Sequence, residues 1–168
     1  MKNKRAFLAA MAALMVMMTV AVNALPAFAQ EPPPPILGEP LSGRATFVDQ
    51  IDLKFKISHD GSATTVVNAG DPSQTVVVKY TVQPGAQFPW HTHAGPVVVN
   101  VASGALTYIA ADDCSEHTYT AGQAFVDAGH GHAHSAINPT DAPTILIATF
   151  FEAPASGPLL IPVDPAAC

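Results

Sequence analysis

Histidines in one short segment of this chain are spaced as metal ligands would be. In FPWHTHAGPVVVN, residues 88–100, His91 and His93 are separated by a single residue. Side chains two apart on a β-strand point to the same face, so both imidazoles can approach one ion. A site for zinc or a similar ion would then need a third ligand from another part of the chain.

A second segment supplies candidates for that third ligand. GHGHAHSAIN, residues 129–138, contains His130, His132 and His134, which share alternate spacing although the glycines can interrupt a strand before His132. A lone histidine is usually a satisfied polar residue, but burying several imidazoles without partners costs free energy. Imidazole suits iron, copper, nickel and zinc, so the two segments together predict a site for a divalent transition metal.

The elements that position these residues are predicted to be strands. Between residues 43 and 152 the sequence has no helical period, and short β-branched and aromatic runs alternate with turn residues. The predicted strands cover residues 45–57, 64–68, 75–82, 97–102, 105–110, 124–127 and 144–152. Many short strands at this spacing predict an all-β sandwich or small barrel.

The first histidine segment resembles the first motif of the cupins, G-x5-H-x-H-x3,4-E-x6-G. Gly85, His91, His93 and Gly104 fit its spacing. The glutamate position is occupied by a valine, at residue 97 or, with the longer spacing, at residue 98.

The second segment resembles the second cupin motif, G-x5-P-x-G-x2-H-x3-N. Gly131, His134 and Asn138 fit the spacing, Gly129 stands in the proline position, and Gly122 precedes it with one extra residue. Either motif alone is a weak signal. The two in order identify residues 85–138 as similar to a small single-domain cupin.

The resemblance implies a small antiparallel double-sheet β-barrel of the jelly-roll type, with a metal in its lumen. Carried over by position, His91, His93 and His134 are the ligands of a divalent metal, which could be iron, manganese, nickel, copper or zinc. The missing glutamate leaves three alternatives. The site could be a neutral three-His site, similar to that of some cupin dioxygenases acting on thiols or diketones. His132 could be an extra ligand or a hydrogen-bonding partner of a ligand, or the site could be degenerate.

Two functions from different classes follow from this resemblance. The first is a metal-binding oxidoreductase, dioxygenase-like, that acts on a small molecule with oxygen. The alternative is a non-catalytic module that captures a small molecule or a metal. Loss of the glutamate disfavours base-assisted chemistry such as sugar epimerisation. Asp127 is a candidate for orienting a histidine through its free ring nitrogen, with a turn carboxylate as the plainer interpretation.

The N-terminus is typical of a secretory signal peptide. Basic residues at positions 2, 4 and 5 precede an apolar run, and small residues at 27 and 29 fit a cleavage site after Ala29. We expect export to the periplasm or the outside medium, with an uncleaved membrane anchor as the alternative. The predicted organisation is a signal peptide at 1–29, a Pro-rich arm at 30–42, a barrel at 43–153 and a Pro-rich tail at 154–168.

Net charge and cysteine content limit the possible partners of the protein and its cellular compartment. Cleavage leaves four basic and thirteen acidic residues, so the net charge becomes 4 − 13 = −9 with histidine neutral. Such a negative surface disfavours binding to nucleic acids and to anionic membranes. We therefore expect a small molecule as the partner. A homodimer is expected only from the family resemblance. An even cysteine count in an exported chain predicts a disulfide between Cys114 and Cys168, with two free thiols as the alternative.

Overall fold

The regular elements of the described residues are all strands. The structure, a computed structural model, describes residues 35–58, 64–70 and 74–168, so the predicted signal peptide lies outside the described residues. The strands are β1 (Ile36–Pro40), β2 (Ala45–Thr46), β3 (Leu53–Ile57), β4 (Thr65–Ala69), β5 (Gln74–Val82), β6 (Gln87–Thr92), β7 (Val97–Ser103), β8 (Ala105–Ala110), β9 (Glu116–Thr120), β10 (Ala124–Asp127), β11 (His134–Ile137), β12 (Thr144–Phe150) and β13 (Ile161–Pro162).

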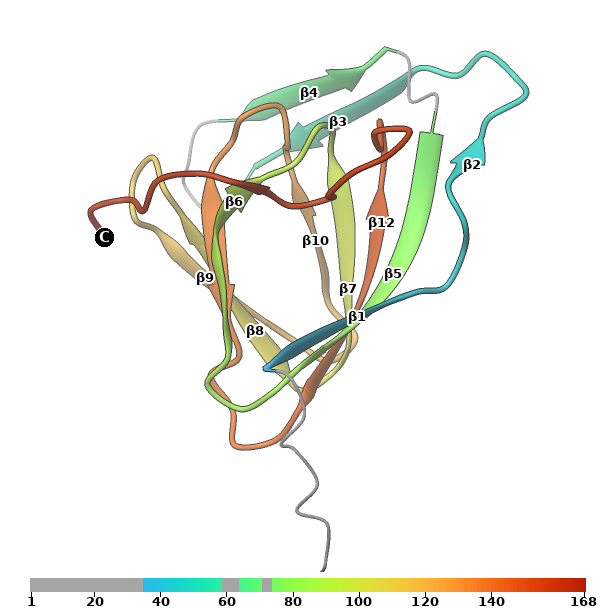
Figure 1. The fold of residues 1–168 in the computed structure, drawn as a ribbon. Helices are drawn as coiled ribbons and strands as arrows, with labels where there is room; N and C mark the ends of the chain where they lie inside the picture. Colours follow the sequence, from blue (N-terminus) through green and yellow to red (C-terminus); the bar gives the residue numbers. More distant parts are fainter. Residues whose placement is uncertain (1–34, 59–63, 71–73) are drawn as a thin grey trace, which may run out of the picture. The chain divides into compact units, whose positions relative to one another are not determined.

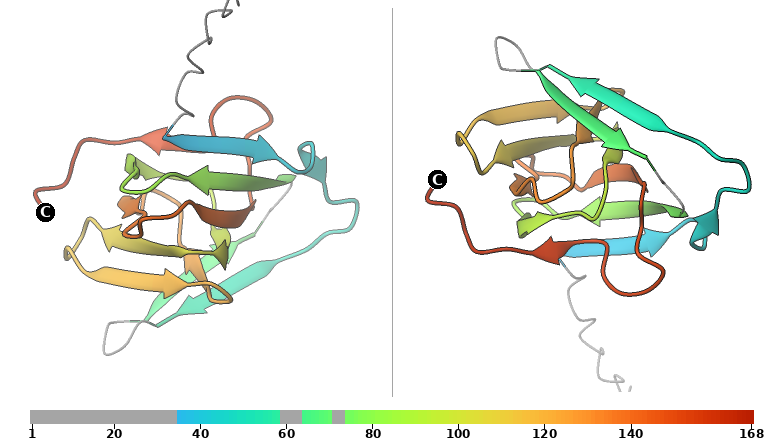
Figure 2. Two further views of the ribbon diagram at one scale, coloured as in Figure 1. Left: turned by 90° about the horizontal axis from the view of Figure 1, so that it is seen from below. Right: turned by 90° about the horizontal axis from the view of Figure 1, so that it is seen from above.

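Two antiparallel sheets carry most of these strands (Figure 1). The first has the order β1-β5-β12-β7-β10, with β2 paired to β5, and the second has the order β13-β6-β11-β8-β9. The β3–β4 hairpin forms a separate two-stranded sheet. The views from below and from above in Figure 2 show this hairpin beside the strands of the two larger sheets. The predicted all-β, antiparallel double-sheet architecture is confirmed.

Alternating side chains of the two sheets meet in one core. In β12, Leu146, Ala148 and Phe150 are buried while the residues between them are partly exposed, as expected for a strand with one face on a core. Leu106 and Tyr108 of the opposite sheet belong to the same buried cluster. This shared core holds the site strands β6 and β11 of one sheet against β7 and β10 of the other.

The predicted strand at 45–57 is interrupted between β2 and β3. β2 pairs with β5, whereas β3 pairs with β4, so the chain crosses from one sheet to another between residues 46 and 53. The alternating pattern at Leu53, Phe55 and Ile57 is retained in β3, where these three are the less exposed residues. The flanking segments, expected as arm and tail, each contribute a short edge strand, β1 and β13.

The described part of the chain contains no helix with the length and apolar character that crossing a membrane would require.

Candidate metal centre

His91 and His93 are brought to the interior by β6. His91 lies within this strand and His93 directly follows it, and both side chains are buried. Their ring centroids are 4.8 Å apart. Phe88 and Phe150 contact the two rings, with centroids 6.0 Å from His91 and 5.3 Å from His93 respectively. Thus the HxH spacing places two imidazoles side by side against aromatic walls.

His134 completes a group of three imidazoles. It opens β11 and is the register partner of His91 on β6. Its ring centroid lies 4.2 Å from that of His91 and 5.2 Å from that of His93. Each of the three offers a ring nitrogen within 4.8 Å of the others, which is a spacing that one metal ion can span. The structure therefore brings together the three predicted ligands from both segments.

Gly129 lets the two histidine segments approach each other. Gly129 has a φ of +62°, and a Cβ there would lie 2.0 Å from the carbonyl oxygen of Gly95. A side chain at 129 would therefore push the two loops apart. The backbone N–H of His130 donates to the carbonyl of His93 over 3.0 Å, which ties the loops together. The close packing of the two loops thus explains why glycine occupies the motif proline position.

Backbone carbonyls define the ring orientation of His91 and His93. The Nδ1 atom of His91 lies 2.7 Å from the Pro89 carbonyl oxygen, and Nδ1 of His93 lies 2.8 Å from that of Leu159. A carbonyl only accepts hydrogen bonds, so both rings carry their proton on Nδ1. The Nε2 lone pairs of both residues are thereby left available to an ion.

Burial keeps the three imidazoles in the neutral form that binds metals. Burial and, to a lesser extent, repulsion from the neighbouring His93 together lower the pKa of His91 to about 4. Burial likewise lowers the pKa of His134 to about 3 and lowers the pKa of His93. Protons therefore do not compete with a metal at these rings near neutral pH, where the ligands are already deprotonated.

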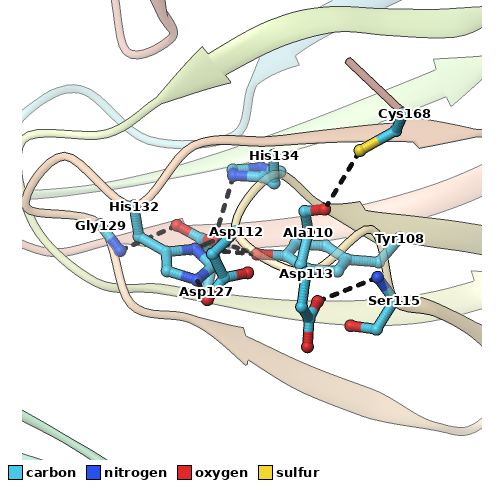
Figure 3. Close-up of polar contacts among 10 residues, drawn as sticks. All are labelled: Tyr108, Ala110, Asp112, Asp113, Ser115, Asp127, Gly129, His132, His134 and Cys168. Carbon is cyan, nitrogen blue, oxygen red and sulfur yellow. Dashed lines mark hydrogen bonds and ion pairs between the residues drawn. The ribbon is translucent and has the colours of Figure 1, made fainter. Parts of the chain in front are cut away.

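Asp127 is buried beside His134 and also accepts a hydrogen bond within its own turn, so features of both interpretations of this residue are present. The side chain is 1% exposed at the end of β10. Its Oδ1 accepts the backbone N–H of Gly129 over 2.9 Å, and its Oδ2 accepts the hydroxyl of Tyr108 over 2.7 Å (Figure 3). The same Oδ2 lies 3.1 Å from Nδ1 of His134. That contact is bent, because Nδ1 makes no in-line hydrogen bond.

His132 lies next to this carboxylate and not in the group of three. Its Nδ1 is 3.3 Å from the Tyr108 hydroxyl and 3.7 Å from Oδ2 of Asp127, and its side chain is 31% exposed. The nearby Asp127 raises the pKa of His132. Asp127, His132 and His134 are also close enough to hold an ion. Because the Tyr108 hydroxyl donates to Asp127 and also lies 3.3 Å from Nδ1 of His132, we interpret this second group as a hydrogen-bonded network.

The imidazoles face a small apolar cavity of about 40 Å³. Tyr108 and Asp127 line it together with apolar side chains, among them Val97, Val99, Leu106, Phe125, Leu146 and Leu160. A water molecule occupies about 30 Å³ in the liquid, so this space suits an ion and one small ligand. Val97, at the motif glutamate position, presents only an apolar side chain to the cavity.

The C-terminal segment forms part of the site, which the sequence did not indicate. β13 pairs with β6 at Thr92 and His91, and Leu160 reaches the cavity. The predicted disulfide is confirmed: Cys114 and Cys168 are joined, with Cα atoms 5.5 Å apart. The backbone carbonyl of Leu159, which accepts from His93, has no signature in the sequence.

Other motif and candidate residues have structural roles. His130 points away from the site and pairs with Glu152. Gln87 donates to the hydroxyl of Ser135 over 2.8 Å. Asn138 is fully buried, donates to the carbonyls of residues 82 and 142, and accepts from the backbone and hydroxyl of Thr140.

Comparison with known proteins gives a family and a set of similar solved structures. A family model described as "Cupin domain" matches residues 78–150, which include all three histidines. A comparison with curated proteins finds no match.

Three of the similar solved structures are bacterial. An RmlC-like cupin from Shewanella frigidimarina NCIMB 400 is 30% identical, with 48% of this chain and 68% of that chain covered and a TM-score of 0.42. A conserved protein with a double-stranded β-helix domain from Klebsiella pneumoniae subsp. pneumoniae MGH 78578 is 24% identical, with coverages of 49% and 70% and a TM-score of 0.44. A cupin domain from Bordetella pertussis Tohama I is 24% identical, with coverages of 47% and 82% and a TM-score of 0.41.

These superpositions span about half of the chain, whereas the family match contains both histidine motifs and the strands that carry them. Residues 78–150 form a cupin domain, and through it the chain belongs to the cupin superfamily.

Proposed function

We propose that this chain is an exported cupin that binds a divalent transition metal through His91, His93 and His134 and acts as an oxygen-dependent oxidoreductase on a small molecule. The observation that carries the proposal is the group of three buried, neutral imidazoles with ligand nitrogens within 4.8 Å of one another. An all-imidazole donor set fits iron, nickel, copper or zinc better than manganese, which prefers oxygen ligands. The Cys114–Cys168 disulfide supports an oxidising compartment.

The residues around the imidazoles support chemistry on a small ligand. Three protein ligands leave coordination positions open, and a redox-active metal bound there would supply oxygen activation. The apolar walls favour an apolar group on any ligand that reaches the imidazoles. Tyr108, hydrogen-bonded to Asp127, places a hydroxyl group at the cavity wall.

The alternative function is a non-catalytic module that captures a metal or a small molecule. One observation favours it: the cavity of about 40 Å³ beside the imidazoles is small for a substrate, and Leu160 of the C-terminal segment is part of its lining. Under this alternative the domain would retain its metal without turnover.

Metal analysis of the protein purified from its native compartment tests the proposal. We expect about one equivalent of a transition metal in the wild type and little in His91→Ala and His134→Ala. His130→Ala is the matched control, because this residue lies in the second histidine segment but pairs with Glu152 outside the site. A wild type without metal, or variants that retain it, would refute the metal site.

Oxygen consumption then separates the two functions. The iron-loaded or copper-loaded protein, assayed in an oxygen electrode with small thiols and diketones, should consume oxygen only when His91 and His134 are intact. A wild type that binds metal but consumes no oxygen with either class would favour the capture module.

A further inference from the structure

The carboxylate that is missing from the first motif has a counterpart on the neighbouring strand. β10 pairs antiparallel with β7, and the register places Asp127 directly opposite Val97. Directly opposite residues of an antiparallel pair point to the same face of the sheet. Both residues line the cavity. A negative charge therefore enters the interior at the level of residue 97, but from the adjacent strand.

Both oxygens of the Asp127 carboxylate act as hydrogen-bond acceptors. The N–H of Gly129 occupies Oδ1, and the hydroxyl of Tyr108 occupies Oδ2. Nδ1 of His134 is 3.1 Å from Oδ2, and it is a buried atom without an in-line hydrogen bond. An ionised carboxylate can accept from all three groups, whereas an amide offers an acceptor on one side only.

The third contact is not an in-line hydrogen bond, but it favours a proton on Nδ1 of His134, because a lone pair there would face the negative Oδ2 at 3.1 Å. A proton on Nδ1 leaves the lone pair on Nε2 for an ion. His91 and His93 reach the same state by donating from Nδ1 to backbone carbonyls. The ring of His134 is also stacked on Tyr108, with centroids 4.8 Å apart and an interplanar angle of 18°. Asp127 and Tyr108 thus hold this ring from its edge and its face.

We infer that Asp127 is a positioning residue that takes over part of the role of the missing motif glutamate: it fixes His134 in the Nδ1-protonated form and places a negative charge beside the three neutral ligands. This inference rests on the proposed metal site. It assigns the carboxylate to a ligand and not to the ion, because Oδ2 lies beside Nδ1 of His134 and Asp127 does not belong to the group of three converging ring nitrogens.

Asp127→Asn tests the inference without breaking the turn. The asparagine oxygen can still accept the N–H of Gly129, but its NH₂ group would face Tyr108 and His134. His134 would then have to accept on Nδ1 and carry its proton on Nε2, where the ion should bind. Asp112→Asn is the matched control, since Asp112 is 4.0 Å from His132 and its side chain is 69% exposed.

The first measurement is the ¹⁵N chemical shifts of the imidazoles in the metal-free protein. We expect Nδ1-protonated His134 in the wild type and in Asp112→Asn, and Nε2-protonated His134 in Asp127→Asn. His91 and His93 are internal references and should stay Nδ1-protonated in all three proteins. An Nε2-protonated His134 in the wild type would overturn the inference even if Asp127→Asn failed to fold.

The second measurement is the affinity for Zn²⁺, with folding checked by melting temperature. We expect Asp127→Asn to bind Zn²⁺ about 10–100-fold more weakly than the wild type, as for other partners of metal-binding histidines. Equal affinities or an unchanged His134 tautomer would overturn the inference. A wild type that binds no Zn²⁺ or other metal would instead refute the proposed function, while the metal-free tautomer comparison would still decide the role of Asp127.

Discussion

His93 and Leu159, 66 residues apart in the chain, are joined by a hydrogen bond of 2.8 Å from the imidazole Nδ1 to the backbone carbonyl oxygen. One of the three candidate ligands is therefore oriented by a segment outside the two cupin motifs. The same segment adds β13 to the edge of the site strand and reaches the Cys114–Cys168 disulfide. The integrity of the metal site and that of the C-terminal segment are consequently linked.

Replacing both cysteines with serine should weaken the fold and the site together. A bridge between residues 54 apart restricts the unfolded chain, and its loss typically costs about 2–4 kcal/mol. For a domain of this size that corresponds to a fall in melting temperature of about 10 °C. Zn²⁺ affinity should also fall, because the carbonyl that orients His93 is less firmly held.

Reductant provides the control for this prediction. Dithiothreitol should lower the melting temperature of the wild type to that of the double serine variant and leave the variant unchanged. Equal melting of the wild type with and without reductant, once full reduction is verified by thiol titration, would contradict the prediction.

The metal-free protein should lose stability as the pH falls from about 6.5 towards 4. The pKa of folded His91 is about 4, below its ordinary value of 6.5, so the unfolded chain binds more protons between these values. The contribution of neutral His91 to the free energy of unfolding is fully present above pH 6.5, the pKa of His91 in the unfolded chain. At about pH 5, roughly 2 kcal/mol of this free energy has been lost for His91 alone. Urea unfolding at several pH values in a chelating buffer measures this dependence.

His91→Gln separates this contribution from other acid effects. Glutamine does not titrate, so the variant should show a shallower fall in stability over the same pH window. Identical pH dependence in the two proteins would show that protonation of His91 does not contribute.

Val97→Glu should restore a carboxylate at the motif position and make stability dependent on metal. Val97 is 1% exposed and lines the cavity, so an unpaired carboxylate there costs several kcal/mol in the metal-free protein. A bound cation offsets that cost, and the added oxygen ligand favours harder ions such as Mn²⁺. We expect a lower melting temperature without metal and a larger rise on adding Mn²⁺ than in the wild type.

Val97→Gln is the matched variant for that experiment, because it has nearly the same shape without the charge. It should melt lower than the wild type with little recovery on adding Mn²⁺. If the glutamate and glutamine variants respond alike to Mn²⁺, the side chain at 97 does not reach the ion.

Asn138→Ala should destabilise the protein without changing its metal affinity. The side chain of Asn138 is fully buried and makes hydrogen bonds with Val82, Thr140 and Ala142. Removing it leaves several buried polar groups without partners, which costs about 2–4 kcal/mol. Urea unfolding and Zn²⁺ titration of the folded variant measure the two effects separately. Weaker Zn²⁺ binding at unchanged stability would indicate a direct role in the site.

Much of the framework followed from local patterns. The strands predicted at residues 105–110 and 124–127 have the bounds of β8 and β10. The motif spacing predicted that His91, His93 and His134 would converge, and the structure places them together. These features are readable because strand alternation and ligand spacing act within a few residues.

The features that escaped prediction depend on pairing between distant segments. β9 was missed because its residues alternate between exposed and partly buried polar side chains at the sheet edge. Asp127 was named as a candidate for orienting a histidine, but its position opposite Val97 depends on strand register, which no local pattern encodes. The acceptor at Leu159 is a backbone carbonyl, which every residue type carries, so the sequence cannot indicate it. His132 follows a glycine outside β11, so its even spacing with His134 did not bring it to the same place.

The link between His93 and Leu159 also sets an order of events during biogenesis. The imidazole of His93 cannot acquire its acceptor until the chain has been synthesised as far as Leu159, 66 residues later, and has folded. Closure by Cys114 and Cys168 must await the arrival of residue 168 in an oxidising environment. If the chain is exported and binds a metal as proposed, stable metal loading would be a late step of maturation, completed together with the disulfide in the oxidising compartment. The ion that is retained would then be chosen from the cations of the destination compartment and not from those present where the chain is made.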